Sequence, residues 1–179
     1  MRGMIALAAA ALLAACSTQP PRAVARGMPS LQLAPSSLGG TLALQQRLVF
    51  THGQRSDTVD ALLEADADSV RVVLHQHGQV MLRLVWDGES LRQDRAAQLP
   101  EALSAQRVLD DLQLVHWPAP AIRAALPPGW QLLEAPGARH LLNHGETVAS
   151  VSWPDEHAAR LDNHREGYRL DIRSAAAQP

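Results

Sequence analysis

The sequence predicts an α+β fold: a curled antiparallel sheet, an open or half barrel, with a two-helix insert that covers its concave face. Three features of the 179-residue chain predict it. Apolar residues recur with a period of two from about residue 42 to residue 93, with a helical period between about residues 100 and 126, and with a period of two again up to residue 173. Short turns between the first strands favour an antiparallel meander. A sheet with one apolar face must cover that face, and the helices are the available cover.

The N-terminus has the pattern of a secretory signal peptide over residues 1–15. Arg2 precedes an apolar run that is too short to span a bilayer and that ends in small residues. The run closes on Leu13-Ala14-Ala15-Cys16, which resembles the lipobox of bacterial lipoproteins. The resemblance implies that Cys16 receives a diacylglycerol, becomes the mature N-terminus and anchors the protein in a membrane. The alternative is an ordinary secretory signal that leaves Cys16 unmodified.

The residue after the cysteine and the segment beyond it bear on location. In the enterobacterial sorting rule an Asp after the cysteine retains a lipoprotein in the inner membrane. Ser17 therefore implies the periplasmic face of the outer membrane. Residues 16–38 are rich in Pro, Ser, Ala and Gly and predict a flexible tether, with Leu31 and Leu33 as candidates for docking on the domain. One domain is expected over residues 39–174, followed by a frayed tail over residues 175–179.

Composition excludes several classes of function. The formal net charge is −2 and the basic residues, all arginines, form no basic stripe, so nucleic acid is not an expected partner. Cys16 is the only cysteine, so the domain has no disulfide. The chain contains no phosphate-binding loop and no nucleophile elbow, and we expect no cofactor.

The individual elements follow from the same periodicities. Strands are expected over residues 42–50, 59–66, 70–74, 80–86 and 90–93. Pro100 suits the first position of a helix that Trp117-Pro118 ends, and a second helix runs over residues 120–126. Strands resume over residues 130–133, 139–143, 147–153 and 168–173, whereas the polar residues 154–166 predict a loop.

Residues 108–118, which read V-L-D-D-L-Q-L-V-H-W-P, resemble the central motif of the bacterial family DUF3261. In that family a Leu-x-Asp-Leu-Gln-Leu run leads into Trp-Pro, a short helix and a strand that bears an arginine, here Arg139. Residues 78–88 and Tyr168-x-Leu170-x-Ile172 also fit, so the resemblance covers about residues 40–173. The family has no established activity, but its members are often lipoproteins and some are encoded among genes for aryl polyene lipids.

The order of strands and helices is also similar, at the level of the fold, to the lipoprotein carriers LolA and LolB. Those carriers hold acyl chains in an open barrel. The membrane-inserting loop of LolB aligns with no residue of this chain.

No residues form a recognised catalytic or metal-binding motif, and we expect neither kind of site. His75 and His77 share one face of a strand, but no further ligand completes a metal site, so a solvated hairpin end is favoured. His116 stands at a helix end, where capping of carbonyl groups is favoured over catalysis. Asp110 and Asp111 could act as an acid/base pair, but adjacent helix residues point apart and a solvated face is expected.

The four tryptophans suit either a packed core or a cavity for lipid. If the helices leave a gap above the sheet, its candidate lining residues are Leu82, Leu84, Trp86, Leu109, Leu112, Trp117 and Trp130. We therefore expect a non-catalytic lipoprotein that binds or passes on a hydrophobic ligand, such as an acyl chain, a lipoprotein or an aryl polyene lipid. The alternatives are a structural or assembly lipoprotein that acts through protein contacts and a hydrolase or transferase without a recognisable motif. An apolar cavity distinguishes the first hypothesis from the second, and convergent titratable groups in a cleft favour the third.

Overall fold

A computed structural model describes residues 27–97, 99 and 103–177. The predicted signal peptide, Cys16 and the tether as far as residue 26 lie outside the described residues, as do Pro100 and residues 178–179. No helix in the described part of the chain is long and apolar enough to cross a membrane.

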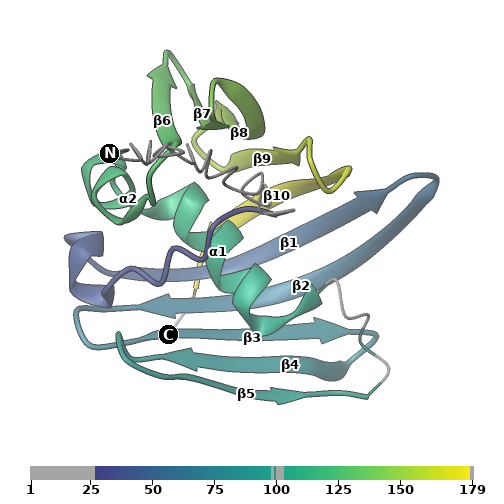
Figure 1. The fold of residues 1–179 in the computed structure, drawn as a ribbon. Helices are drawn as coiled ribbons and strands as arrows, with labels where there is room; N and C mark the ends of the chain where they lie inside the picture. Colours follow the sequence, from purple (N-terminus) through teal and green to yellow (C-terminus); the bar gives the residue numbers. More distant parts are fainter. Residues whose placement is uncertain (1–26, 98, 100–102, 178–179) are drawn as a thin grey trace, which may run out of the picture.

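Ten antiparallel strands form one sheet, and two α-helices and a short 3-10 helix accompany it (Figure 1). The strands are β1 (Leu42–His52), β2 (Arg55–Ala65), β3 (Val70–Gln76), β4 (Gln79–Trp86), β5 (Leu91–Arg95), β6 (Trp130–Ala135), β7 (Ala138–Asn143), β8 (Glu146–Asp155), β9 (Ala158–Asn163) and β10 (Tyr168–Ala176). The helices are η1 (Pro35–Leu38), α1 (Ala105–His116) and α2 (Ala119–Ala125).

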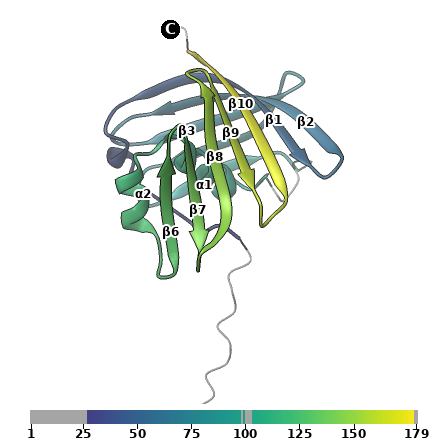
Figure 2. The same cartoon turned by 90° about the horizontal axis from the view of Figure 1, so that it is seen from above.

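The strand order is β5-β4-β3-β2-β1-β10-β9-β8-β7-β6, so the first and last strands meet at the centre of the sheet. The segment that contains α1 and α2 joins β5 to β6, which are the two edge strands, and α1 crosses one face of the sheet on the way (Figures 1 and 2). The sheet does not close into a barrel. The predicted α+β fold, an open curled sheet with a two-helix insert, is confirmed.

The core lies between the sheet and α1. Apolar residues of β3 and β4 such as Val72, Leu82 and Leu84 are almost fully buried, as are Leu109 of α1 and Ile122 of α2. Alternate residues of a strand point to opposite faces, and in the second half of β2 buried and exposed residues alternate strictly, as the period of two predicts.

The helix α1 begins later than the sequence predicts. The expected start is Pro100, whereas the structure begins α1 at Ala105, with Ser104 as its N-cap. The Ser104 hydroxyl oxygen accepts a hydrogen bond from the Arg107 backbone N–H at 3.2 Å. A side-chain oxygen at this position satisfies an amide that the first turn of a helix leaves unpaired, which fixes the start of the helix.

The prediction of a loop over residues 154–166 is wrong, because strand β9 lies within this range. This strand pairs with both β8 and β10. Its inward residues are Ala159, Leu161 and Asn163, so only one of them is a large apolar residue. The alternation that marks the other strands is therefore weak at β9.

Two predictions at the ends of the domain also change. The tail expected from residue 175 continues β10 to Ala176, and the backbone N–H of Ala177 donates to the carbonyl oxygen of Ala43 at 2.9 Å. Met28, Leu31 and Leu33, which the sequence places in a flexible tether, are buried. We call residues 28–38 the strap.

The strap lies across α1 and is held by side chains of the domain (Figure 1). Asp110 accepts from the Leu31 backbone N–H at 2.9 Å, and Gln113 exchanges two hydrogen bonds with the backbone of Leu33. The indole N–H of Trp86 also donates to the Leu33 carbonyl oxygen, at 2.8 Å. Composition alone predicts a free segment here, but buried partners satisfy its backbone, so it packs as part of the domain.

Candidate functional site

An apolar recess separates α1 from the central strands of the sheet. Its walls are Val108, Leu112 and Val115 of α1 and, facing them, residues of the sheet that include Leu48, Val59 and Ile172. The recess encloses about 70 Å³. A water molecule occupies about 30 Å³ of liquid, so this volume is small, and an apolar space of this kind stays dry.

The rim of the recess is apolar and half-open. Leu48 and Phe50 of β1, Leu103 before α1, Val108 of α1 and Leu170 of β10 are partly exposed while packing against the core. The Phe50 ring at this end of the recess packs against the ring of Tyr168, with 5.2 Å between the ring centres. Large apolar side chains therefore face solvent along one side of α1.

The residues expected to line a cavity fall mostly elsewhere. Leu112 lines the recess, but Leu82, Leu84, Trp86, Leu109 and Trp117 are buried in solid core, and Trp130 is half-buried beneath the Arg165 guanidinium. The physical reason is the path of α1. The apolar positions of β4 pack closely beneath the helix, whereas the gap opens above β1, β2, β3 and β10.

A pair of polar residues on neighbouring strands interrupts the apolar face of the sheet at the far end of the recess. Gln46 of β1 and Ser174 of β10 are paired in register, and the Gln46 amide nitrogen donates to the Ser174 hydroxyl oxygen at 2.9 Å. The same amide nitrogen lies 3.4 Å from Nε2 of His116, the last residue of α1. We call Gln46, His116 and Ser174 the polar trio.

A second space, the end cavity, lies beyond the polar trio and encloses about 230 Å³. His116 lines both the recess and the end cavity. Leu44, Trp153 and Ser174 are among the other residues around the end cavity, with Glu156 and His157. The two spaces therefore lie one behind the other, with the polar trio at their junction.

The carbonyl groups at the end of α1 are capped by Arg139 rather than by His116. Nη1 of Arg139 donates to the carbonyl oxygens of Leu114 and Trp117, at 3.0 and 2.8 Å. The Arg139 guanidinium also stacks 4.7 Å from the centre of the Trp153 ring. Burial, helped by the Arg139 cation, lowers the pKa of His116 to about 4, so His116 is neutral at pH 7.

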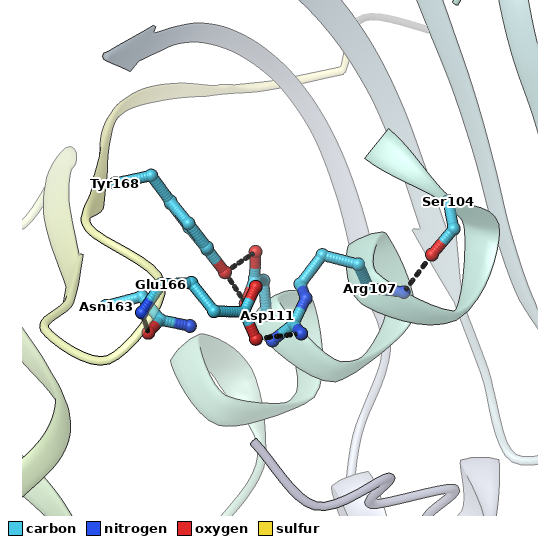
Figure 3. Close-up of polar contacts among 6 residues, drawn as sticks. All are labelled: Ser104, Arg107, Asp111, Asn163, Glu166 and Tyr168. Carbon is cyan, nitrogen blue, oxygen red and sulfur yellow. Dashed lines mark hydrogen bonds and ion pairs between the residues drawn. The ribbon is translucent and has the colours of Figure 1, made fainter. Parts of the chain in front are cut away.

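Asp110 and Asp111 are buried, which corrects the solvated face predicted for them. Figure 3 shows Asp111, Arg107, Glu166 and Tyr168 converging. The Tyr168 hydroxyl donates to the Asp111 carboxylate with both oxygens at 2.8 Å, and Arg107 is ion-paired with Glu166. Arg107 and Asp111 lie at the edge of the recess.

Burial dominates the titration of this carboxyl cluster. It raises the pKa of Asp110 to about 6 and that of Asp111 to about 7, although the hydrogen bonds that both carboxylates accept act in the opposite direction. The cluster therefore contains convergent titratable groups, the feature that would favour a hydrolase or transferase. Its hydrogen bonds, however, are made to one another and to the strap, and no nucleophilic side chain lies in it among the described residues.

No group of three or more metal-ligating side chains occurs in the described part of the chain. His75 and His77 lie at the hairpin between β3 and β4, where His77 has a positive φ of 50° and is exposed. A larger depression of about 620 Å³ lies on the opposite face of the sheet, lined by exposed residues such as Arg47 and Asp60. That depression is open to solvent, and its wall mixes charged side chains with apolar ones such as Leu62.

Comparison with known proteins adds the following. The profile of the family DUF3261, described as a protein of unknown function, matches residues 43–176. No curated protein matches the chain significantly. Among solved structures, a similar one is a crystal structure from Vibrio parahaemolyticus, described as an outer membrane lipoprotein-sorting protein domain. It shares 8% sequence identity with a TM-score of 0.41, over 84% of this chain and 86% of that chain. Because the family profile spans most of the chain, this protein belongs to the DUF3261 family.

Proposed function

We propose that this protein is a lipid-anchored, non-catalytic binder of a single acyl chain, which it holds between α1 and β1, β2 and β10. The observation that carries the proposal is the apolar recess with its half-open apolar rim. Most of the wall is apolar, and Arg107 and Asp111 at its edge are bonded to Glu166 and Tyr168. Such a wall favours hydrocarbon over a polar substrate, because a polar group would lose its hydration there with little compensation.

Binding requires the recess to widen. Small-molecule sites usually enclose about 300 Å³ or more, and the recess encloses about 70 Å³. Movement of α1 away from β1 and β10 would supply the space, since the rim on that side is held by partly exposed side chains rather than by backbone pairing. The strap binds the Asp110 and Gln113 side of α1, so it leaves this side of the helix free.

The predicted anchor places the recess near a membrane surface. The described chain begins beside the recess: a side-chain carbon at Gly27 would lie 2.9 Å from Oε1 of Glu166 and 3.4 Å from the Arg107 guanidinium. The eleven steps from Cys16 to Gly27 span at most roughly 40 Å when extended. An acylated Cys16 in the outer membrane would therefore keep the recess within reach of lipid.

The test is uptake of a fluorescently labelled acyl chain by the purified protein. Leu112→Trp should block uptake with little change in melting temperature if the space opens for a ligand. The matched control is Leu142→Trp on β7, a half-buried position outside both cavities, which should leave uptake unchanged. Absence of uptake by the wild type would rule the proposal out.

The small volume of the recess favours one competing function, that of a structural lipoprotein that acts through protein contacts. In that case α1 and the sheet simply form a filled core. Leu112→Trp would then overpack the space and lower the free energy of unfolding by roughly 1–3 kcal/mol. A large fall in stability together with no uptake by the wild type would therefore support the structural function.

A further inference from the structure

We infer that the polar trio binds the uncharged, oxygen-bearing part of the ligand, so that the protein selects an acyl ester such as a monoacylglycerol over a free fatty acid. In this arrangement the chain lies in the recess toward Phe50 and the remaining polar part lies in the end cavity. The inference rests on the proposed function, because it assigns the class of ligand for the same site.

The position of the trio is the first observation. Inward residues of β1 are Leu42, Leu44, Gln46, Leu48 and Phe50, so Gln46 is the one polar residue of that row. Its neighbour across the ladder, Ser174, is the one polar residue among the inward positions of β10 that follow Tyr168. Gln46 is only 7% exposed and Ser174 is half-buried. Polar groups buried on an apolar face lower stability unless they are satisfied, which suggests that this pair has a function.

Free hydrogen-bonding capacity is the second observation. Gln46 uses its amide nitrogen within the trio. Among the described residues, no protein partner takes up the Gln46 carbonyl oxygen, the Ser174 hydroxyl proton or Nδ1 of His116. Because an amide nitrogen only donates, Nε2 of the neutral His116 ring is the acceptor and Nδ1 carries the proton. The trio therefore offers two donors, the Ser174 hydroxyl and the His116 Nδ1–H, and one acceptor, the Gln46 carbonyl oxygen. An ester carbonyl next to a hydroxyl supplies the complementary acceptor and donor.

Charge is the third observation. An amide and a hydroxyl carry no charge, and His116 is neutral at pH 7. A carboxylate would have to leave water without meeting a cation in the trio, which is unfavourable. Arg139 lines neither cavity, and its Nη1 is bonded to the end of α1. Arg107 does line the recess, but it is ion-paired with Glu166. The titratable side chains on the end cavity, Glu156 and His157, lie 3.2 Å from each other.

Size is the fourth observation. Neither the recess nor the end cavity alone reaches the roughly 300 Å³ of a typical small-molecule site. His116 is the side chain that both share. A ligand that passes it would occupy both spaces, with hydrocarbon on the apolar side and oxygen atoms at the trio.

The experiment displaces the bound fluorescent acyl probe with monopalmitoylglycerol or with palmitate at pH 7.5. Wild-type protein should bind monopalmitoylglycerol about tenfold more tightly than palmitate. Gln46→Leu should remove most of this preference, because leucine cannot form the hydrogen bonds that the glutamine amide offers to the ester group. Ser174→Ala changes only one oxygen atom and should reduce the preference without unfolding the protein.

Gln45→Leu is the matched control, since Gln45 is the exposed neighbour of Gln46 on the opposite face of β1. It should keep the wild-type preference. Equal affinity for both lipids, tighter binding of palmitate, or an unchanged preference in both Gln46→Leu and Ser174→Ala would overturn the inference and leave the acyl-binding proposal intact. Failure of the probe itself to bind the wild type would overturn the proposed function instead.

Discussion

Asp111 shows how strongly one residue can depart from what its type suggests. Asp111 lies on α1, and its carboxylate faces the Tyr168 hydroxyl rather than water. Burial raises its folded-state pKa to about 7, whereas an unfolded chain ionises Asp near pH 3.9. Between these two values the folded protein holds a proton that the unfolded chain has lost. The free energy of unfolding therefore falls as the pH rises through this window.

Asp111→Asn removes this titration and keeps an acceptor for Tyr168. We expect the stability of the variant relative to wild type to increase from pH 5 to pH 8, by up to about 1.4 kcal/mol for each pH unit inside the window. Urea unfolding at a series of pH values measures it. Asp94→Asn, an exposed site, is the control and should show a constant difference. A relative stability of Asp111→Asn that stays constant over the same range would contradict the assignment of burial as the cause.

The sequence predicts some of the site residues and misses others for one physical reason. Periodicity predicts which side of an element is apolar, and it correctly turns Leu109 and Leu112 inward. It does not predict which polar residues join them, because a polar residue on an apolar face breaks the pattern. Gln46 stands between Leu44 and Leu48 in such a break, and that interruption was the available signal.

At the scale of elements, the strap is the largest difference from expectation. Pro-rich composition predicts a flexible tether, with Leu31 and Leu33 as candidates for docking on the domain. Both leucines are buried, as is Pro35, so every second position of this segment packs inward. The hydrogen-bond partners of the segment, Asp110 and Gln113, come about 80 residues later, so local pattern does not predict which side chains hold it.

Gln113→Leu tests the strap. Gln113 is fully buried and both accepts from and donates to the Leu33 backbone, at 3.1 and 3.0 Å. Leucine would leave the Leu33 N–H buried without an acceptor, at a cost of roughly 1–3 kcal/mol. We expect a lower urea midpoint and faster hydrogen exchange at the Leu31 and Leu33 amides.

Gln131→Leu on β6 is the control, because Gln131 is exposed. It should change neither quantity. If Gln113→Leu destabilises the protein while the strap amides stay protected, the glutamine supports the core and not the strap.

At the scale of the whole molecule, the sequence predicts the class of fold because its repeating pattern spans every strand but β9. Topology is a different matter. Nothing in the alternation along β1 or β10 says that these two strands pair, since pairing depends on a partner at the other end of the chain. The sequence predicts that helices cover the apolar face of the sheet. It does not predict where the gap lies, because that depends on the path of α1 across the sheet.

The central ladder gives a prediction about truncation. Deleting residues 172–179 removes half of β10, including the buried Ile172, and exposes β1 along an unpaired edge. We expect the cooperative urea transition to disappear, although only eight residues are lost. Circular dichroism and urea titration measure this loss. Deletion of residues 178–179 leaves β10 whole and serves as the control. A normal transition in the longer deletion would mean that the two halves of the sheet fold independently.

The same ladder has a consequence for biosynthesis. Leu44 pairs with Ala176, so the ladder between β1 and β10 cannot be completed until the ribosome has made the chain as far as residue 176. Until then one edge of β1 lacks its partner strand. If the predicted signal peptide directs the protein across a membrane, this delay would help to keep the polypeptide unfolded during translocation. Pairing of β10 with β1 would then complete the sheet on the far side of the membrane.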